Sequence, residues 1–165
     1  MSDARATEGL VVGTGELALG GPPERRIVTY ALGSCVAVTA YDPLVRVGAM
    51  LHSLLPDPGE QPYPKQLNQF VYAPTGVPAM VRRLVQRGAR SSRLVLCAAG
   101  GADVLVDAVQ PSVGARNRTT VRRILWKMNL PLAAEDTGGD AARTMTLDLV
   151  TGAVEVRARD RTAVV

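Results

Sequence analysis

The chain has very few aromatic residues. It contains one phenylalanine, one tryptophan and four tyrosines among 165 residues, yet 47% of the chain is hydrophobic. The core must therefore be aliphatic, built mainly from valine, leucine and alanine. Charged residues make up 21% and are evenly spread, which argues against a disordered chain.

Cysteine is also scarce, with only Cys35 and Cys97 present. Two cysteines are too few for a disulfide framework, which agrees with a reducing compartment. Neither cysteine has the spacing of a metal site, and the one histidine, His52, has no histidine partner. We therefore expect no metal and no cofactor.

Long apolar runs are absent as well. No run approaches the roughly 18 residues needed to span a bilayer, and the first residues, MSDARATEG, lack the basic and apolar regions of a signal peptide. We expect a cytoplasmic protein without membrane insertion. Its length suits one domain, placed at residues 10–160, with residues 1–9 as a flexible N-terminus.

Strand patterns outnumber helix patterns, which predicts an α+β domain with mixed and antiparallel sheets. One helix is expected from a cap at Thr75 to Gly88, and a second from a cap at Asn117 to Met128. Strands are expected at residues 10–19 (one or two), 26–32, 36–41, 47–55, 93–98, 130–134, 143–150 and 153–159. A loop rich in proline and glycine is expected over residues 56–64, beside the proposed site.

The densest alternation of apolar residues lies between Thr29 and Pro56. Asp42-Pro43 interrupts it, which predicts a β-hairpin. If the loop has two residues, Cys35 lies directly opposite His52 on one face of the sheet, where Cβ atoms are about 4.5–5.5 Å apart. A slip of one residue would bring Ser53 opposite Cys35 instead.

A thiol beside an imidazole is suited to nucleophilic catalysis. The histidine is expected to lower the pKa of the thiol and to return the proton to the leaving group. The alternative is structural, because a lone cysteine in a strand often packs as a small hydrophobe and a lone histidine is often structural. Gly33-Ser34 permits a tight bend near a substrate amide, or an ordinary turn.

The chain also carries an ordered series of short motifs. They are Thr29, Leu32-Gly33-Ser34-Cys35-Val36, Tyr41-Asp42, Gly48, Met50, His52, Leu55-Pro56, Gly88-Ala89, Gly100-Gly101-Ala102, Gly114-Ala115-Arg116-Asn117, Asp136-Thr137-Gly138-Gly139, Arg143 and Thr151-Gly152. This series resembles the CheD family, the chemoreceptor glutamine deamidases of bacterial and archaeal chemotaxis. The resemblance covers residues 10 to 158.

The resemblance implies that Cys35, His52 and Thr29 are catalytic, and that the layered sheets are flanked by helices as in toxin-type cysteine deamidases. Cys35 would form a thioester with a glutamine side chain, and Thr29 would accept a hydrogen bond from the second ring nitrogen of His52. Gly33 and Ser34 would adjoin the substrate. The family pattern is broken at Ala49, Pro74 and Ala99, and we expect these three positions to lie away from the catalytic residues.

The resemblance implies that the substrate is the acidic cytoplasmic helical bundle of a chemoreceptor. Arg118, Arg122 and Arg123 on the second helix would steer it by complementary charge, or else form an ordinary solvated face. A second hypothesis is a regulatory module that binds a CheC-type phosphatase. The net charge of +4 and pI of about 9.5 would suit a nucleic-acid binder, but the dispersed basic residues and few aromatic rings argue against one.

Overall fold

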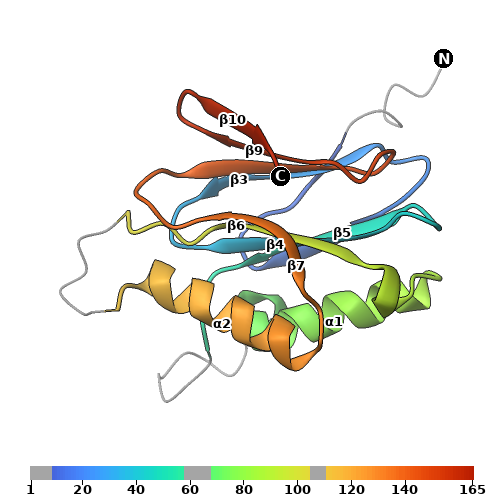
Figure 1. Ribbon diagram of the computed structural model, residues 1–165, viewed down its shortest axis with the longest axis horizontal. Coiled ribbons are helices and arrows are strands. Elements are labelled where there is room, and N and C mark those ends of the chain that lie inside the picture. Colours follow the sequence, from blue (N-terminus) through green and yellow to red (C-terminus); the bar gives the residue numbers. More distant parts are fainter. Residues whose placement is uncertain (1–8, 58–67, 105–110) are drawn as a thin grey trace.

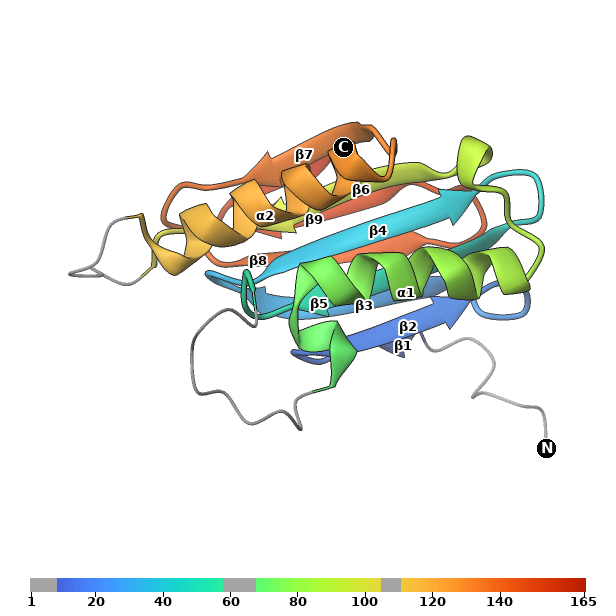
Figure 2. The ribbon, with the colours of Figure 1, turned by 90° about the horizontal axis from the view of Figure 1, so that it is seen from below.

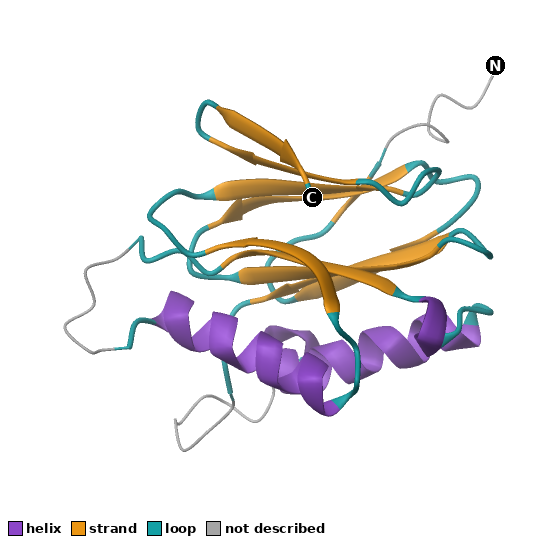
Figure 3. Ribbon diagram, in the orientation of Figure 1, coloured by secondary structure: helices purple, strands orange, loops and turns teal. Residues whose placement is uncertain are grey.

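Two five-stranded sheets stack face to face, and two helices cover one of them (Figures 1 and 3). The computed structural model describes residues 9–57, 68–104 and 111–165. Most of the expected flexible N-terminus and of the expected loop at 56–64 lies outside these ranges. The α+β class expected from the strand patterns is confirmed, and the layering of sheets and helices implied by the resemblance is observed.

The outer sheet has the strand order β1-β3-β8-β9-β10, and the central sheet has the order β2-β5-β4-β6-β7. Each contains one parallel pair, β1 with β3 and β6 with β7, and is otherwise antiparallel. The outer strands are β1 (Leu10–Val11), β3 (Arg26–Leu32), β8 (Arg143–Asp148), β9 (Val154–Ala158) and β10 (Arg161–Val164). The central strands are β2 (Glu16–Gly20), β5 (Val47–Ser53), β4 (Val36–Asp42), β6 (Val95–Gly100) and β7 (Leu132–Thr137).

Helices α1 (Ala73–Gln86) and α2 (Val113–Lys127) lie on the face of the central sheet that points away from the outer sheet (Figure 2). Two single 3₁₀ turns, η2 (Gln69–Val71) and η3 (Ser91–Arg93), precede α1 and β6. None of the helices in the described ranges has the length and apolar character needed to cross a membrane.

The central sheet is buried on both faces, so the molecule has two aliphatic core layers. Val38, Leu51, Met80 and Leu84 belong to the layer between this sheet and the helices. The layer between the sheets includes Cys35, Ala37 and Met50 from the central sheet and Met145 and Leu147 from the outer sheet. As a result, a polar side chain on the inner face of either sheet is removed from water and needs a partner inside the protein.

The hairpin register differs from the one predicted from sequence. Asp42 pairs with Val47 and Ala37 with His52, so the loop has four residues, Pro43 to Arg46. The predicted direct pairing of Cys35 with His52 is therefore wrong. The longer turn is fixed by an Asp42 carboxylate that accepts from Leu44 N–H at 3.0 Å, and by Arg46 in the left-handed region with φ of 55°.

Both predicted helix caps are also wrong. α1 begins at Ala73, and the Thr75 hydroxyl donates to Gln69 O at 2.5 Å instead of capping the helix. Ser112 caps α2, because its Oγ accepts from Ala115 N–H at 3.1 Å. Asn117 thus lies within the helix. Strand β10 was not predicted.

Asp42 closes the hairpin through contacts with a distant part of the chain. Its fully buried carboxylate accepts from Arg90 N–H at 2.9 Å and forms an ion pair with Arg93 at 2.7 Å. Burial acts to raise the pKa of Asp42, but Arg93 and the backbone N–H groups of Arg90, Leu44 and Val45 outweigh it and lower the pKa from 3.8 to about 2.

Replacement of this carboxylate should destabilise the fold in a pH-dependent way. A depressed pKa stabilises the folded state above the unfolded pKa, and this stabilisation is lost as the pH falls from about 4 toward 2. We expect Asp42→Asn to lower the free energy of unfolding by about 2 kcal/mol at pH 7, with a smaller difference near pH 2. Urea unfolding at several pH values measures this. Asp140→Asn, at an exposed ion pair of 3.7 Å, is the control and should have little effect.

Candidate active site

His52 lies near the end of β5 and points into the layer between the two sheets, with only 2% of its surface exposed. Its cross-strand neighbours are Ala37 on β4 and Glu16 on β2. Ala37 is fully buried and presents only a methyl group to the imidazole.

The tautomer of His52 follows from its hydrogen bonds. The Thr29 hydroxyl lies 2.7 Å from Val12 O and 2.8 Å from His52 Nδ1. A carbonyl oxygen can only accept, so the single hydroxyl proton of Thr29 goes to Val12. Thr29 Oγ1 must then accept from Nδ1–H, which leaves Nε2 unprotonated in the neutral ring. Nε2 is buried and has no hydrogen-bond partner among the described residues.

A bulge in β3 aims Thr29 at the histidine. The pairing of β3 with β8 shifts by one residue between Thr29 and Leu32, so both side chains face inward although they are three positions apart. Ala31, inside the bulge, has a left-handed φ of 55°. Bulges often occur next to active sites, where they redirect side chains.

Cys35 lies just before β4 and is held by its neighbours' backbone. Cys35 O accepts from Gly101 N–H at 2.7 Å, and Gly33 O accepts from Ala102 N–H at 2.8 Å. Gly100, with φ of 106°, lies so close that a Cβ there would collide with Cys35 O. Gly100 therefore packs directly against the backbone of Cys35.

Cys35 and His52 are diagonal cross-strand neighbours. Because Ala37 is opposite His52, Cys35 lies two positions further along the same inter-sheet face. Diagonal neighbours are separated by about 7–8 Å between Cα atoms, still within reach of a long or aromatic side chain. Gly33 and Ser34 adjoin Cys35 and are both partly exposed.

The electrostatic environment favours a neutral pair. Burial lowers the pKa of His52 below 6.5, although the charge of Glu16 raises it in part. Burial also raises the pKa of the Cys35 thiol, against a smaller lowering by its own backbone N–H. The expectation of a lowered Cys35 pKa is therefore wrong for the free protein, because desolvation of the thiolate outweighs the groups that favour it.

These shifts predict the pH dependence of any reaction that uses His52 as a base. Protonated His52 cannot accept a proton, so kcat/KM should fall on the acid side with a midpoint below 6.5. Glu16→Gln removes the charge that raises the pKa and should move the midpoint to still lower pH. A pH–rate profile for both proteins measures this, and a parent midpoint above 6.5 would contradict the assignment.

The three arginines predicted to bind substrate have different surroundings. Arg118 donates to Gly101 O and lies 3.6 Å from the Asp103 carboxylate. Arg122 forms a 3.0 Å ion pair with Glu135. Arg123 is exposed and lines a shallow cavity of about 130 Å³ with Lys127 and Pro74.

One departure from the family pattern lies beside the catalytic residues. Ala99 pairs with Ala37, which pairs with His52, so all three share one cross-strand row. The expectation that all departures lie away from the catalytic residues is wrong for Ala99. Ala49, by contrast, belongs to the layer under the helices, and Pro74 lies in the first turn of α1.

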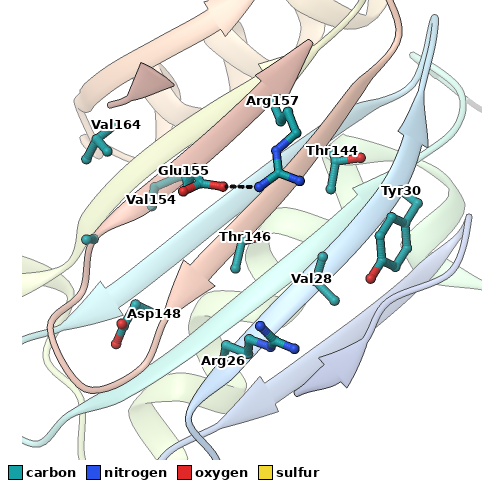
Figure 4. A pocket seen from close by; sticks show the side chains of 11 residues that line it. Arg26, Val28, Tyr30, Thr144, Thr146, Asp148, Val154, Glu155, Arg157 and Val164 are labelled. Carbon is teal, nitrogen blue, oxygen red and sulfur yellow. Dashed lines mark hydrogen bonds and ion pairs between the residues drawn. The ribbon is translucent and has the colours of Figure 1, made fainter. Parts of the chain in front are cut away.

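In the described part of the chain, the surroundings of Cys35, His52 and Thr29 contain no metal site and are separate from the hollow on the outer sheet. Within residues 9–57, 68–104 and 111–165, no group of three or more metal-binding side chains is found. A hollow of about 500 Å³ is lined by Arg26, Tyr30, Asp148 and Arg157 on the uncovered face of the outer sheet (Figure 4). It includes neither Cys35 nor His52.

Two residues of the site were not predicted. Val12 supplies the carbonyl that orients Thr29, and no side-chain pattern can reveal a backbone contact. Asn117 donates through Nδ2 to Ser34 O at 2.8 Å and to Leu54 O at 3.0 Å. Its signal in the sequence is a polar residue four positions before Val121, on the buried face of the helix.

Known proteins resemble this chain over nearly its full length. The family model described as "CheD chemotactic sensory transduction" matches residues 54–158. A protein of Symbiobacterium thermophilum is 45% identical over 159 residues, 94% of each chain. One of Solibacter usitatus is 39% identical over 145 residues, 88% of this chain and 86% of its own. One of Pyrococcus abyssi is 39% identical over 153 residues, 92% of each.

All three relatives are named as probable chemoreceptor glutamine deamidases. The family model begins after Cys35 and His52, whereas the relative from Symbiobacterium thermophilum aligns with 94% of the chain. By this extent of similarity, the chain belongs to the CheD family.

Proposed function

We propose that this protein converts glutamine side chains of chemotaxis receptors to glutamate, with Cys35 as nucleophile and His52 as general base and acid. The observation that carries the proposal is the hydrogen bond from His52 Nδ1–H to Thr29, because it leaves the basic Nε2 free on the face shared with Cys35. The names of the relatives support the choice of substrate.

The first half of the reaction forms a thioester. As Cys35 Sγ attacks the side-chain carbonyl carbon, its proton passes to His52 Nε2, so that no free thiolate is needed beforehand. The carbonyl oxygen becomes a tetrahedral oxyanion. When this intermediate collapses, the carbon–nitrogen bond breaks, and Nε2–H protonates the departing nitrogen, which leaves as ammonia.

The second half uses water. His52, again neutral, takes a proton from a water molecule while the water oxygen attacks the thioester carbon. The carbon–sulfur bond breaks, the proton returns to Cys35, and the product is glutamate. Thr29 accepts from Nδ1–H throughout and stabilises the imidazolium form of His52 in each half.

Mass spectrometry of a chemoreceptor cytoplasmic fragment co-expressed with this protein tests the proposal. Conversion of glutamine to glutamate adds about one mass unit at specific sites, and Cys35→Ala shows the background. We expect site-specific conversion with the parent protein and none above background with Cys35→Ala. Equal conversion with parent and variant would show that this chain is not the deamidase.

We further propose that the exposed arginines Arg122 and Arg123 steer the acidic receptor bundle toward the site. Charge complementarity acts mainly on the association rate and is screened over about 10 Å at 0.1 M salt. Arg118 differs because its guanidinium is partly buried and bound to Gly101 O and Asp103. Arg122 is paired with Glu135, but its side chain stays half exposed.

Neutralisation of Arg122 and Arg123 should slow the association of the enzyme with the receptor bundle. We expect Arg122→Gln with Arg123→Gln to lower the second-order deamidation rate about threefold to tenfold at low salt, with convergence to the parent rate at high salt. The control is Arg157→Gln with Arg159→Gln, which removes the same charge from exposed sites on the outer sheet and its edge. Equal effects of the two pairs would assign the change to net charge.

Binding of a CheC-type phosphatase and a structural relationship to toxin-type deamidases remain predictions. The receptor substrate and the CheC-type regulator can be separated by experiment. Loss of Cys35 would abolish deamidation but leave binding of a regulator intact.

A further inference from the structure

Asn117 joins the ends of two strands of the central sheet. It lies in the second turn of α2, is 2% exposed, and donates one Nδ2 proton to Ser34 O and the other to Leu54 O. The ladder between β4 and β5 ends at the pair Val36 and Ser53, so these carbonyls lie just beyond it. Two carbonyl acceptors require the NH₂ group, which fixes the orientation of the amide.

The contact with Ser34 O also fixes the direction of the next N–H. In a planar trans peptide the C=O of one residue and the N–H of the next point in opposite directions. The Ser34 carbonyl points to the side-chain amide of Asn117, so the Cys35 N–H points away from that side chain. It cannot be turned without breaking a 2.8 Å hydrogen bond.

The Cys35 N–H has lost the acceptor that a continuous sheet would provide. Val36 pairs with Gly100, so Cys35 would next pair with Gly101, and Gly101 N–H does donate to Cys35 O at 2.7 Å. The reciprocal bond is missing. In the described part of the chain, Cys35 N–H donates to no other residue.

The reason lies in the turn that follows β6 and in the residue next to Asn117. Gly100 and Gly101 have φ of 106° and 60°, which bends the chain out of the ladder. Gly101 O then accepts from Arg118. Adjacent residues of α2 thus hold the Ser34 carbonyl and occupy the Gly101 carbonyl.

We propose that Asn117 is a positioning residue that holds the Ser34–Cys35 peptide so that the Cys35 N–H donates to the oxyanion formed during deamidation. The inference rests on the proposed function. A backbone N–H beside the nucleophile that is oriented in advance and lacks another partner stabilises charge that develops only in the transition state.

Replacement of Asn117 should therefore slow chemistry without impairing the thiol. We expect Asn117→Ala to lower kcat about 100-fold with KM within about threefold of the parent. Alkylation of Cys35 by iodoacetamide forms no oxyanion, so its rate should stay within about threefold. Asn117→Leu, which keeps the approximate size but has no donor, should lower kcat and leave alkylation unchanged in the same way, and it serves if the alanine variant does not fold. Thr120→Ala, at a buried polar site of α2, is the control.

The result that would overturn the inference is an unchanged kcat, or a fall in alkylation that parallels the fall in kcat. A readout independent of activity is the backbone NMR of ¹³C,¹⁵N-labelled protein. The Ser34 carbonyl and Cys35 amide signals should shift in Asn117→Ala and not in Thr120→Ala, and unshifted signals would refute the positioning role. If the parent protein lacks Cys35-dependent deamidation but these signals shift, the proposed function has failed and the positioning contact has not.

Discussion

Cys35→Ala should lower the rate of receptor deamidation by at least about 10⁴-fold, and His52→Ala should do the same. Without Sγ no thioester can form, and without Nε2 nothing accepts the thiol proton or protonates the leaving nitrogen. The two losses should not add in the double variant, because the two side chains act as a unit. Measured rates of ammonia release for the two single variants and the double variant test this.

The chain contains its own control for the cysteine. Cys97 lies in the same inter-sheet layer, is also buried, and has a pKa raised by burial as Cys35 does. Cys97→Ala therefore removes a sulfur from the same core without touching the proposed chemistry. Cys97→Ala should retain activity near the parent rate, while its change in melting temperature should be similar to that of Cys35→Ala. Loss of activity in Cys97→Ala alone would contradict the assignment of Cys35.

Thr29→Val should give the second large effect, about 100-fold or more in kcat. Valine has nearly the same shape, but it cannot donate to Val12 O or accept from His52 Nδ1–H. Without the acceptor at Nδ1, the ring loses its fixed tautomer. Two buried polar groups also lose their partner, which should lower the free energy of unfolding by about 1–3 kcal/mol for each.

Thr29→Ser separates the role of the hydroxyl from the role of the methyl group. Serine keeps both hydrogen bonds and should retain most of the activity. The ¹⁵N shifts of the imidazole report the tautomer directly, with Nδ1 protonated in the parent protein and in Thr29→Ser. A parent ring protonated at Nε2 would contradict the proposed base.

The strands were predictable because their pattern is local. In β8 the residues Arg143, Met145 and Leu147 are buried and alternate with partly exposed ones, as expected for a strand with one face in a core. The register of the hairpin was not predictable in this way. Its four-residue loop depends on Asp42, whose partners Arg90 and Arg93 lie 48 and 51 positions away.

In the site, too, the residue types could be predicted from the sequence, but their arrangement could not. The residue types Cys35 and His52 pointed to nucleophilic catalysis, and resemblance to a family added Thr29. Their arrangement depends on features without a side-chain signal, namely the bulge at Ala31 and the carbonyl of Val12. Asn117 resembled a helix cap because asparagine favours caps, whereas Ser112 occupies that position.

The hydrogen bond between Thr29 and His52 connects two separate sheets, since Thr29 belongs to β3 and His52 to β5. Its 2.8 Å length therefore depends on how far apart the sheets are held by the side chains between them, such as Met50 and Met145. A change of a few tenths of an ångström barely affects apolar contacts, but it alters a hydrogen bond. The aliphatic packing between the sheets thus sets the length of the hydrogen bond that orients His52, and catalytic rate becomes a more sensitive measure of core geometry than melting temperature.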